Sequence, residues 1–546
     1  MKRNKRILLT VIGIIAVILI ILSLFANSIA KNKIEALLQN NIPEHIESSY
    51  EGISVNVLSG SVSVKNPSIH IKIKDSSLIQ TKMLMKSFVI GGVSYWDYIF
   101  NDKIHIGKIK FKDLQVIQYK DHKNIPKDST EKKEPFQIPK SLTIGKFIIE
   151  NSSIKIIDNT KDSLYLSVEN IKFKLLDIKL DSSTSVKTFK NNYKSIELSA
   201  DSIFLKSGLY ENLTIEHFDH SKNSASIIGL GLKTKYSEKE LSKIIPKERD
   251  HFIINGGSLQ FSDLNYGFEN DTFFLKSSLL AIDKTVAEIY RDKLVADDFK
   301  VKKLYSKSLR ELPINLTIDS VSVKNSSVIY KEKTHIERPP GILTISEIKA
   351  NVSNLSNTYK SPEKTKILVD AVFMKSTPFH ANWSFDVNNK KDEFEFVGDI
   401  GIIYGESLNS LLVPLINAKI DGEIDNTLFT IKGNYYNSMI YMSQKYENVK
   451  IEILNKKKKR NTVVSGIANA FVHNESSSDG TEYNHITTDA TRNNTKSFFN
   501  YLIVNLKEAL LVSFFERKNK KNTVHKVHID HKKYREARLK KKKRKN

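Results

Sequence analysis

Apolar and polar residues alternate along most of the chain from Gly52 onward. The stretches Ile53–Val57 and Ile69–Ile73 carry Ile or Val at every second position. A period of two is typical of β-strands with one apolar face. The pattern predicts a mainly β body between residues 49 and 455, and at about 15 residues per strand and turn we expect about 27 strands.

A recurring unit stands out within this pattern. Segments Ile144–Asp158 and Ile318–Glu332 share a central Asn-Ser-Ser with alternating apolar residues on both sides, and similar units centre on Asn66, Asp113 and Asp263. Because Asn and Asp favour turns, each unit predicts a β-hairpin whose two turn residues begin at the Asx residue.

In that register, each hairpin places its apolar residues opposite one another on one face. The unit at Asp113 fits less well, because Ile109 would meet Gln118, and Pro67 cannot adopt the positive φ of a type I′ turn. The predicted pairs are Val64 with Ile69, Val62 with Ile71, Ile149 with Ile154, Phe147 with Ile156, Phe261 with Tyr266, Leu259 with Phe268, Val323 with Val328, and Val321 with Tyr330.

These units predict one long antiparallel sheet that is apolar on one side. Two architectures satisfy this pattern. A β-sandwich would bury the apolar face on a second sheet. An elongated, curled sheet would instead leave the face open as an apolar groove.

Helical patterns are few. Ser237 with Glu240 reads as a capping box that begins a short helix, and Leu408–Ile416 is a second candidate. Residues 121–139 and 473–496 read as irregular. Residues 497–516 predict an amphipathic helix, and its apolar face, a candidate for membrane contact, comprises Phe499, Leu502, Ile503, Leu506, Leu510 and Phe514.

The N-terminus has the features of a membrane anchor. Four basic residues lie within residues 1–6, and the 20 residues of Ile7–Ala26 carry no charge, which is enough to cross a hydrocarbon core of about 30 Å. The positive-inside rule places residues 1–6 in the cytoplasm and the rest of the chain outside it. A helical pattern continues through residues 27–48. The alternative is a signal peptide cleaved near Ser28–Ala30.

The net charge of +24 is concentrated in terminal and linking segments. Lys456–Arg460 carries five basic residues, and Arg517–Asn546 carries 15 basic and two acidic residues. The remaining body is almost neutral, at about +2, so it lacks the broad basic face of a nucleic-acid-binding domain. Beside the predicted helix, Lys456–Arg460 of the basic and polar segment 456–496 and Lys540–Lys545 of the basic tail 517–546 are suited to an anionic membrane surface.

Catalytic and metal-binding motifs are missing from the sequence. There is no cysteine, no Gly-x-Ser-x-Gly, no phosphate-binding Gly-rich loop and no His-Glu-x-x-His. His217 and His220 lie in a strand-like context, and His525, His528 and His531 lie in the basic tail, where incidental histidines are expected. We therefore expect neither an enzyme nor a cofactor.

Seven short motifs follow one another in order through the C-terminal third. They are Leu408–Ile416, Ala418–Ile424, Lys432–Tyr436, Ser438–Met442, Tyr446–Leu454, Ala468–Phe471 and Thr495–Tyr501. Each motif is loose singly, but in this order they resemble the AsmA-like envelope proteins, and the resemblance extends to the N-terminal anchor and the segment Leu58–Lys72.

The resemblance implies an anchor in the inner membrane and a periplasmic β-groove. It also implies a role in lipid transfer between the inner and outer membranes, with a phospholipid or another acyl-chain lipid as partner. The alternative is an envelope scaffold that binds proteins and assists outer-membrane protein assembly. The basic tail after Glu516 is longer than the family pattern, and the chain is short for bridging two membranes alone.

The basic cap and single apolar run generate a prediction about topology. A reporter enzyme active only outside the cytoplasm should work when fused after Leu454 and also after Asn546. Activity at the first position with silence at the second would contradict it, because residues 497–516 would then cross the membrane.

Overall fold

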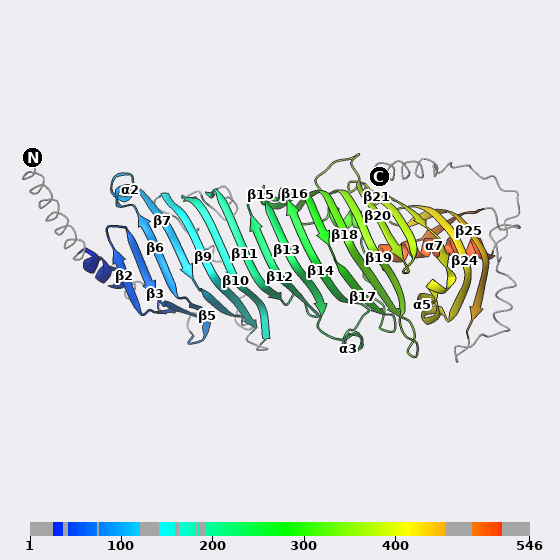
Figure 1. The fold of residues 1–546 in the computed structure, drawn as a ribbon, viewed down its shortest axis with the longest axis horizontal. Coiled ribbons are helices and arrows are strands. Elements are labelled where there is room, and N and C mark those ends of the chain that lie inside the picture. The colour runs from blue at the N-terminus through cyan, green and yellow to red at the C-terminus, as the bar shows by residue number, and fades with distance from the viewer. Residues whose placement is uncertain are drawn as a thin grey trace, which may run out of the picture.

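One curled sheet forms the body of the protein. The computed structural model describes residues 26–36, 42–73, 76–120, 141–158, 163–181, 184, 192–454 and 483–515. Within these residues every strand belongs to a single 26-stranded sheet. Figure 1 shows the strands side by side from the N-terminal (blue) to the C-terminal end (yellow and orange), where the sheet curls. The mainly β, curled architecture is confirmed, and no described strand forms the second layer that a sandwich requires.

The strands of the first half are short near the N-terminus, and the longest two have 18 residues each. They are β1 Ile46–Ser49, β2 Gly52–Asn56, β3 Ser61–Lys65, β4 Ser68–Lys72, β5 Ile79–Leu84, β6 Ser87–Val93, β7 Lys103–Lys112, β8 Gln115–Lys120, β9 Ser141–Asp158, β10 Ser163–Leu180, β11 Ser195–Leu205, β12 Glu211–Ser221 and β13 Ser224–Thr234.

The second half contains the remaining strands and most of the described helices. The strands are β14 Asp250–Ser262, β15 Asn265–Glu269, β16 Thr272–Asp283, β17 Val286–Asp292, β18 Asn315–Lys333, β19 Gly341–Ser356, β20 Thr365–Phe373, β21 Thr377–Phe385, β22 Phe394–Ile400, β23 Ile403–Tyr404, β24 Ala418–Gly433, β25 Asn437–Ile453 and β26 Asn484–Thr491. The helices are α2 Tyr95–Phe100, α3 Glu238–Ile244, α4 Tyr305–Arg310, α5 Gly405–Ile416 and α7 Phe498–Phe515.

The predicted hairpins are wrong, because the segments on either side of each Asx centre pair with other strands and not with each other. Each centre is instead a kink, which lies within a strand at Asn151 and Asn325 and between two strands at Asn66, Asp113 and Asp263. Asn151 has a φ of 48° in the middle of β9. Ile149 pairs with Phe173 and Ile154 with Val168, so both halves of β9 pair with β10 and not with each other. A type I′ turn needs positive φ at two successive residues, and only the Asx residue has it here.

The other four centres behave in the same way. Asn66, Asp113, Asp263 and Asn325 have φ between 47° and 53°, and pairing resumes beyond each of them. The turn between β15 and β16 does have two positive-φ residues, Asn270 and Asp271. This hairpin was not among those predicted from the sequence. In place of the predicted hairpin pairs, Val64 pairs with Phe88, Ile69 with Met83, Phe261 with Leu280, Tyr266 with Leu275, Val323 with Ala350, and Val328 with Ile345.

The two Asn-Ser-Ser segments, on β9 and β18, mark two similar units of the sheet, called here the first and second repeats. In each repeat this long strand runs parallel to the two strands before it, an arrangement called here a parallel joint. β9 runs parallel to β7 and β8, and β18 runs parallel to β16 and β17, so the sheet is not wholly antiparallel. The strand after each joint, β10 or β19, carries two positive-φ residues at matching positions. They are Asn170 and Asp177 on β10, and Glu347 and Asn354 on β19.

A buried serine makes the same contacts in both joints. Ser152 accepts a hydrogen bond from the Leu114 amide at 3.1 Å and donates to the Glu150 carbonyl at 3.0 Å. Ser326 accepts from the Thr285 amide at 3.2 Å and donates to the Lys324 carbonyl at 2.8 Å. Each serine thereby satisfies a backbone amide that the kink of the neighbouring strand leaves out of the ladder.

Several local predictions are confirmed and others need correction. The capping box of Ser237 and Glu240 begins α3, and α5 contains the candidate at 408–416. Residues 484–491, expected to be irregular, form β26. The helix expected over 27–48 covers 26–36, and β1 occupies 46–49.

Three predicted segments lie outside the described residues: the loop at 121–139, the basic run Lys456–Arg460 and the tail 517–546. The apolar run Ile7–Ala26 also lies outside them except for Ala26. Among the helices that the structure describes, none is long and apolar enough to span a membrane.

The serine contacts at the joints generate a prediction. Ser326→Ala leaves the Thr285 amide without its acceptor in a buried position, so we expect a loss of about 1–3 kcal/mol in the free energy of unfolding. Hydrogen exchange at Thr285 should become faster than in the wild type. The neighbouring Ser327→Ala is the control, and equal effects of the two variants would contradict the role given to Ser326.

Candidate functional site

Directly paired residues form an apolar row across the whole sheet. Because paired residues point to the same side of a sheet, the row defines one face, called here the apolar face. Only His220 and Thr488 in the row are polar. Its members are Ile53, Val64, Phe88, Phe111, Ile149, Phe173, Leu198, His220, Ala225, Phe261, Leu280, Val321, Val352, Ile367, Trp383, Phe396, Ile431, Ile440 and Thr488.

The residues predicted for the groove fall on this row and on adjacent rows. Val64, Ile149, Phe261 and Val321 lie in the row itself, although they are distant in sequence. A neighbouring row contains Val62 and Phe147, and another contains Leu259 and Val323. Beyond the kinks, a further row of pairs passes through Ile71, Ile156 and Val328.

The remaining predicted positions lie elsewhere on the strands. Ile69 and Ile154 sit beyond the kinks of their strands. Tyr330 donates a hydrogen bond to Glu332 at 2.7 Å, and burial raises its pKa, so it has polar surroundings. Tyr266 and Phe268 lie on β15, where Phe268 is exposed.

Aromatic rings strengthen the apolar face in the first repeat. Phe88, Phe111, Phe147 and Phe173 come from β6, β7, β9 and β10, and successive ring centroids are 4.9, 5.7 and 6.1 Å apart. All four side chains are only half-buried. This part of the face therefore keeps access to the space above it.

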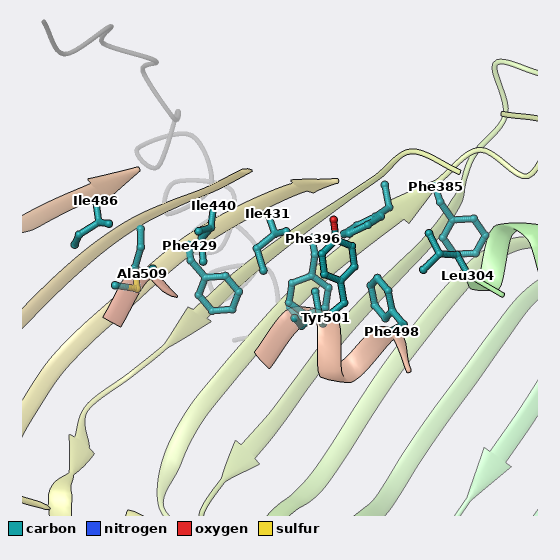
Figure 2. Packing of buried hydrophobic residues seen from close by; sticks show 14 of the residues in the cluster. Leu304, Phe385, Phe396, Phe429, Ile431, Ile440, Ile486, Phe498, Tyr501 and Ala509 are labelled. Atoms are coloured by element: carbon teal, nitrogen blue, oxygen red, sulfur yellow. The ribbon is translucent and has the colours of Figure 1, made fainter. Parts of the chain in front are cut away.

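The same face is sealed at the C-terminal end. Phe396 is 9% exposed, and Ile431 and Ile440 are 0% exposed. Here α7 and α4 pack on the curled strands, and Figure 2 shows Phe498 and Tyr501 beside Phe396 and Leu304 near Phe385. Trp383 stacks on Phe498 with ring centroids 4.4 Å apart. The helices thus close one end of the apolar face.

Two polar residues of α7 point into this core with their partners in place. Asn505, 0% exposed, accepts a hydrogen bond from Ser438 at 2.8 Å. The Ser513 hydroxyl donates to Gln444 at 3.2 Å, and its carbonyl accepts from Tyr446 at 3.1 Å. These contacts fix the rotation of α7 about its axis, because turning the helix would leave buried polar groups unpaired.

The side of α7 that packs on the sheet includes residues predicted to contact a membrane. Leu502 is buried in the core, and Leu506 and Leu510 pack against it, so protein covers these three positions. Phe499 and Ile503 are each 56% exposed and remain candidates for membrane contact. The side chain of Phe514 lies outside the described residues. No pattern in the sequence predicts that the polar residues Asn505 and Ser513 face inward.

A buried carboxylate holds the start of α7 to the sheet. Glu248 accepts hydrogen bonds from Lys293 at 2.7 Å and Lys496 at 2.8 Å, and Arg291 lies 3.9 Å away. Burial is the largest influence on the pKa of Glu248 and raises it. The two lysines outweigh burial and hold the pKa at about 2.

Two cavities lie at the sheet. One of about 750 Å³ is lined by charged residues that include Glu393, Lys432 and Asp489, beside the covered end. The other, of about 450 Å³, is lined by residues of β11, β12 and β15 and includes His220. Neither was apparent from the sequence, because their lining residues are far apart along the chain.

His217 and His220 do not form a metal site. His217 hydrogen-bonds Asp201 at 2.6 Å, whereas His220 lies in the apolar row. Within the described residues no group of three or more His, Asp or Glu side chains is arranged to hold a metal ion. His525, His528 and His531 lie outside those residues.

Comparison with known proteins gives no relative: no family model matches the chain, and neither does any curated protein.

The Glu248 contacts generate a prediction about acid stability. A pKa lowered from 4.5 to about 2 contributes stability that is present above pH 4.5 and lost as the pH falls towards 2. The contribution is up to about 3 kcal/mol. Glu248→Gln should therefore unfold more easily at neutral pH, with a smaller further loss between pH 4.5 and 2.

Chemical denaturation at a series of pH values measures this effect. Glu269→Gln, at the exposed end of β15, is the control. Parallel pH profiles for wild type and Glu248→Gln would contradict the stabilising role of Glu248.

Proposed function

We propose that the protein is a non-enzymatic, membrane-anchored lipid-binding protein whose apolar face holds acyl chains. The observation that carries this proposal is the continuous row of paired apolar residues, which is half-buried from Phe88 to Phe173 and covered by α7 and α4 at its C-terminal end. An apolar surface of this extent on a soluble body normally has a binding role.

Burial of acyl chains supplies the driving force. Each methylene moved from water onto the face contributes about 0.8 kcal/mol. The face needs no reacting residue to hold a chain, and the half-buried aromatic ladder of β6, β7, β9 and β10 offers the contact surface. With the anchor at 7–26 in the inner membrane, as the resemblance to AsmA-like proteins implies, the protein would pass phospholipid towards the outer membrane.

A second candidate function is that of an envelope scaffold assisting outer-membrane protein assembly. One observation favours it: among the described strands, β26 pairs with β25 alone, which leaves one edge for another chain. Strand addition to a sheet edge is a common mode of peptide recognition.

Glutamate substitutions on the two faces of β9 test the lipid proposal. Ile149 lies in the apolar row, and the adjacent Ile148 faces the other side between Lys110 and Lys174. Both isoleucines are half-buried, so Ile148→Glu is a matched control. We expect Ile149→Glu to fold at near-normal yield and lose most co-purifying lipid, while Ile148→Glu keeps it, measured by mass spectrometry of extracted lipids.

A photo-crosslinking residue at position 149 gives an independent reading. Lipid adducts there are the expected result. Protein-only adducts in a well-folded sample, or equal lipid content in the two glutamate variants, would overturn the proposal and favour the scaffold.

A further inference from the structure

The cavity of about 450 Å³ adjoins the apolar face in the first repeat. Its lining comes from the start of β11, the turn between β12 and β13, and the start of β15. The volume is within the range of small-molecule sites. The lining residues are Tyr193, Lys194, Ser195, Ile196, His220, Lys222, Asn223, Leu264, Asn265 and Tyr266.

His220 is the unexplained residue of this site. It is 7% exposed, and neither ring nitrogen has a hydrogen-bond partner. Its ring meets Tyr266 edge-on at 5.6 Å, and its paired neighbours Leu198 and Ala225 are apolar. A buried polar side chain without a partner costs stability, so an imidazole at this position of an apolar row points to a polar ligand.

The charge of the lining indicates the sign of that ligand. Lys194 and Lys222 are both exposed, and the lining contains no carboxylate. Lys194 has only a distant ion pair, 3.9 Å from Asp177. Two cations and a histidine without a counter-charge in the lining favour an anion.

One residue of the cavity wall also packs against the apolar residues of the sheet. Tyr193 lines the cavity and also packs against the cluster of Ile144, Leu175 and Ile178. Phe147 and Phe173, which belong to the aromatic ladder, pack against the same cluster. A molecule with its polar end in the cavity can therefore lay an apolar chain along the ladder.

We propose that this cavity binds the anionic head group of a phospholipid whose acyl chain lies on the apolar face. His220 turns about χ2 to bring a ring nitrogen to a hydroxyl of the head group, and Lys194 and Lys222 balance the phosphate charge, which no choline cation offsets in an anionic head. The inference rests on the proposed function and deepens it, because it assigns the protein a preference for anionic heads.

Two lipids with the same single acyl chain and different heads test the proposal on the full-length protein. We expect fluorescently labelled lysophosphatidylglycerol to bind at least about tenfold tighter than lysophosphatidylcholine. His220→Phe keeps an aromatic ring against Tyr266 and should remove this preference without weakening lysophosphatidylcholine. Lys222→Gln should reduce the preference about threefold.

His217→Phe is the matched control, because His217 is on the same strand, partly exposed, and outside the cavity lining. It should keep the preference, and thermal unfolding should show that all variants are folded. Equal binding of the two lipids, or a preference unchanged in His220→Phe, would overturn the head-group site while leaving the lipid proposal intact.

Two further outcomes separate the remaining possibilities. Binding of neither lipid would overturn the proposed function together with this inference. The last outcome is that inorganic phosphate binds, that neither lipid binds, and that His220→Phe abolishes the phosphate binding. This result would identify a free-anion site and overturn the lipid head-group assignment.

Discussion

The structure depends on keeping strands in register through their kinks. A strand such as β18 spans Asn315–Lys333, and a residue at positive φ within it must be matched by its neighbours or the ladder breaks. Asn325 and Lys284 meet this condition side by side, since the Lys284 amide bonds the Lys324 carbonyl at 3.1 Å. Register retained in this way is what aligns apolar side chains from nineteen strands into one row.

A sheet apolar on one side must have that side covered or leave it open to a ligand. At the C-terminal end α7 and α4 supply the cover, and Glu248 ties Lys496 at the start of α7 to Lys293 after β17. In the first repeat, no described helix packs on Phe147 or Phe173. The apolar face is therefore one continuous surface with two different environments.

Sequence periodicity was sufficient for the strands and for much of the face, because alternation reports directly on which side a residue faces. It placed Val64, Ile149, Phe261 and Val321 on one side, and all four lie in one row. It failed at Asn151, since an Asx residue at positive φ suits a hairpin turn and a kink equally well. The difference is set by the pairing partner, β10, which local sequence does not reveal.

Contacts between residues far apart in the chain could not be predicted from local sequence patterns either. The parallel joints depend on where the chain returns after β8 and β17, and periodicity is the same for either direction. The inward face of α7 depends on Ser438 and Gln444, which are far away in the chain. His220 was interpreted as an incidental histidine for the same reason. Its apolar and aromatic surroundings are formed by Ala225 together with Leu198 and Tyr266, and the last two are distant in the sequence.

Corresponding positions in the two repeats carry side chains of different size, and the difference follows whether a described helix packs on them. Counted from the kinks and strand pairing, Ile149, Phe173, Leu198 and His220 of the first repeat correspond to Val323, Ala350, Val369 and Ala381 of the second. Ala381 lies in the core with α7, and Val369 packs against that core. Small side chains at these two positions leave room for α7. The first repeat carries larger residues at these positions, where no described helix lies above them, which is consistent with the proposed acyl chain as their cover.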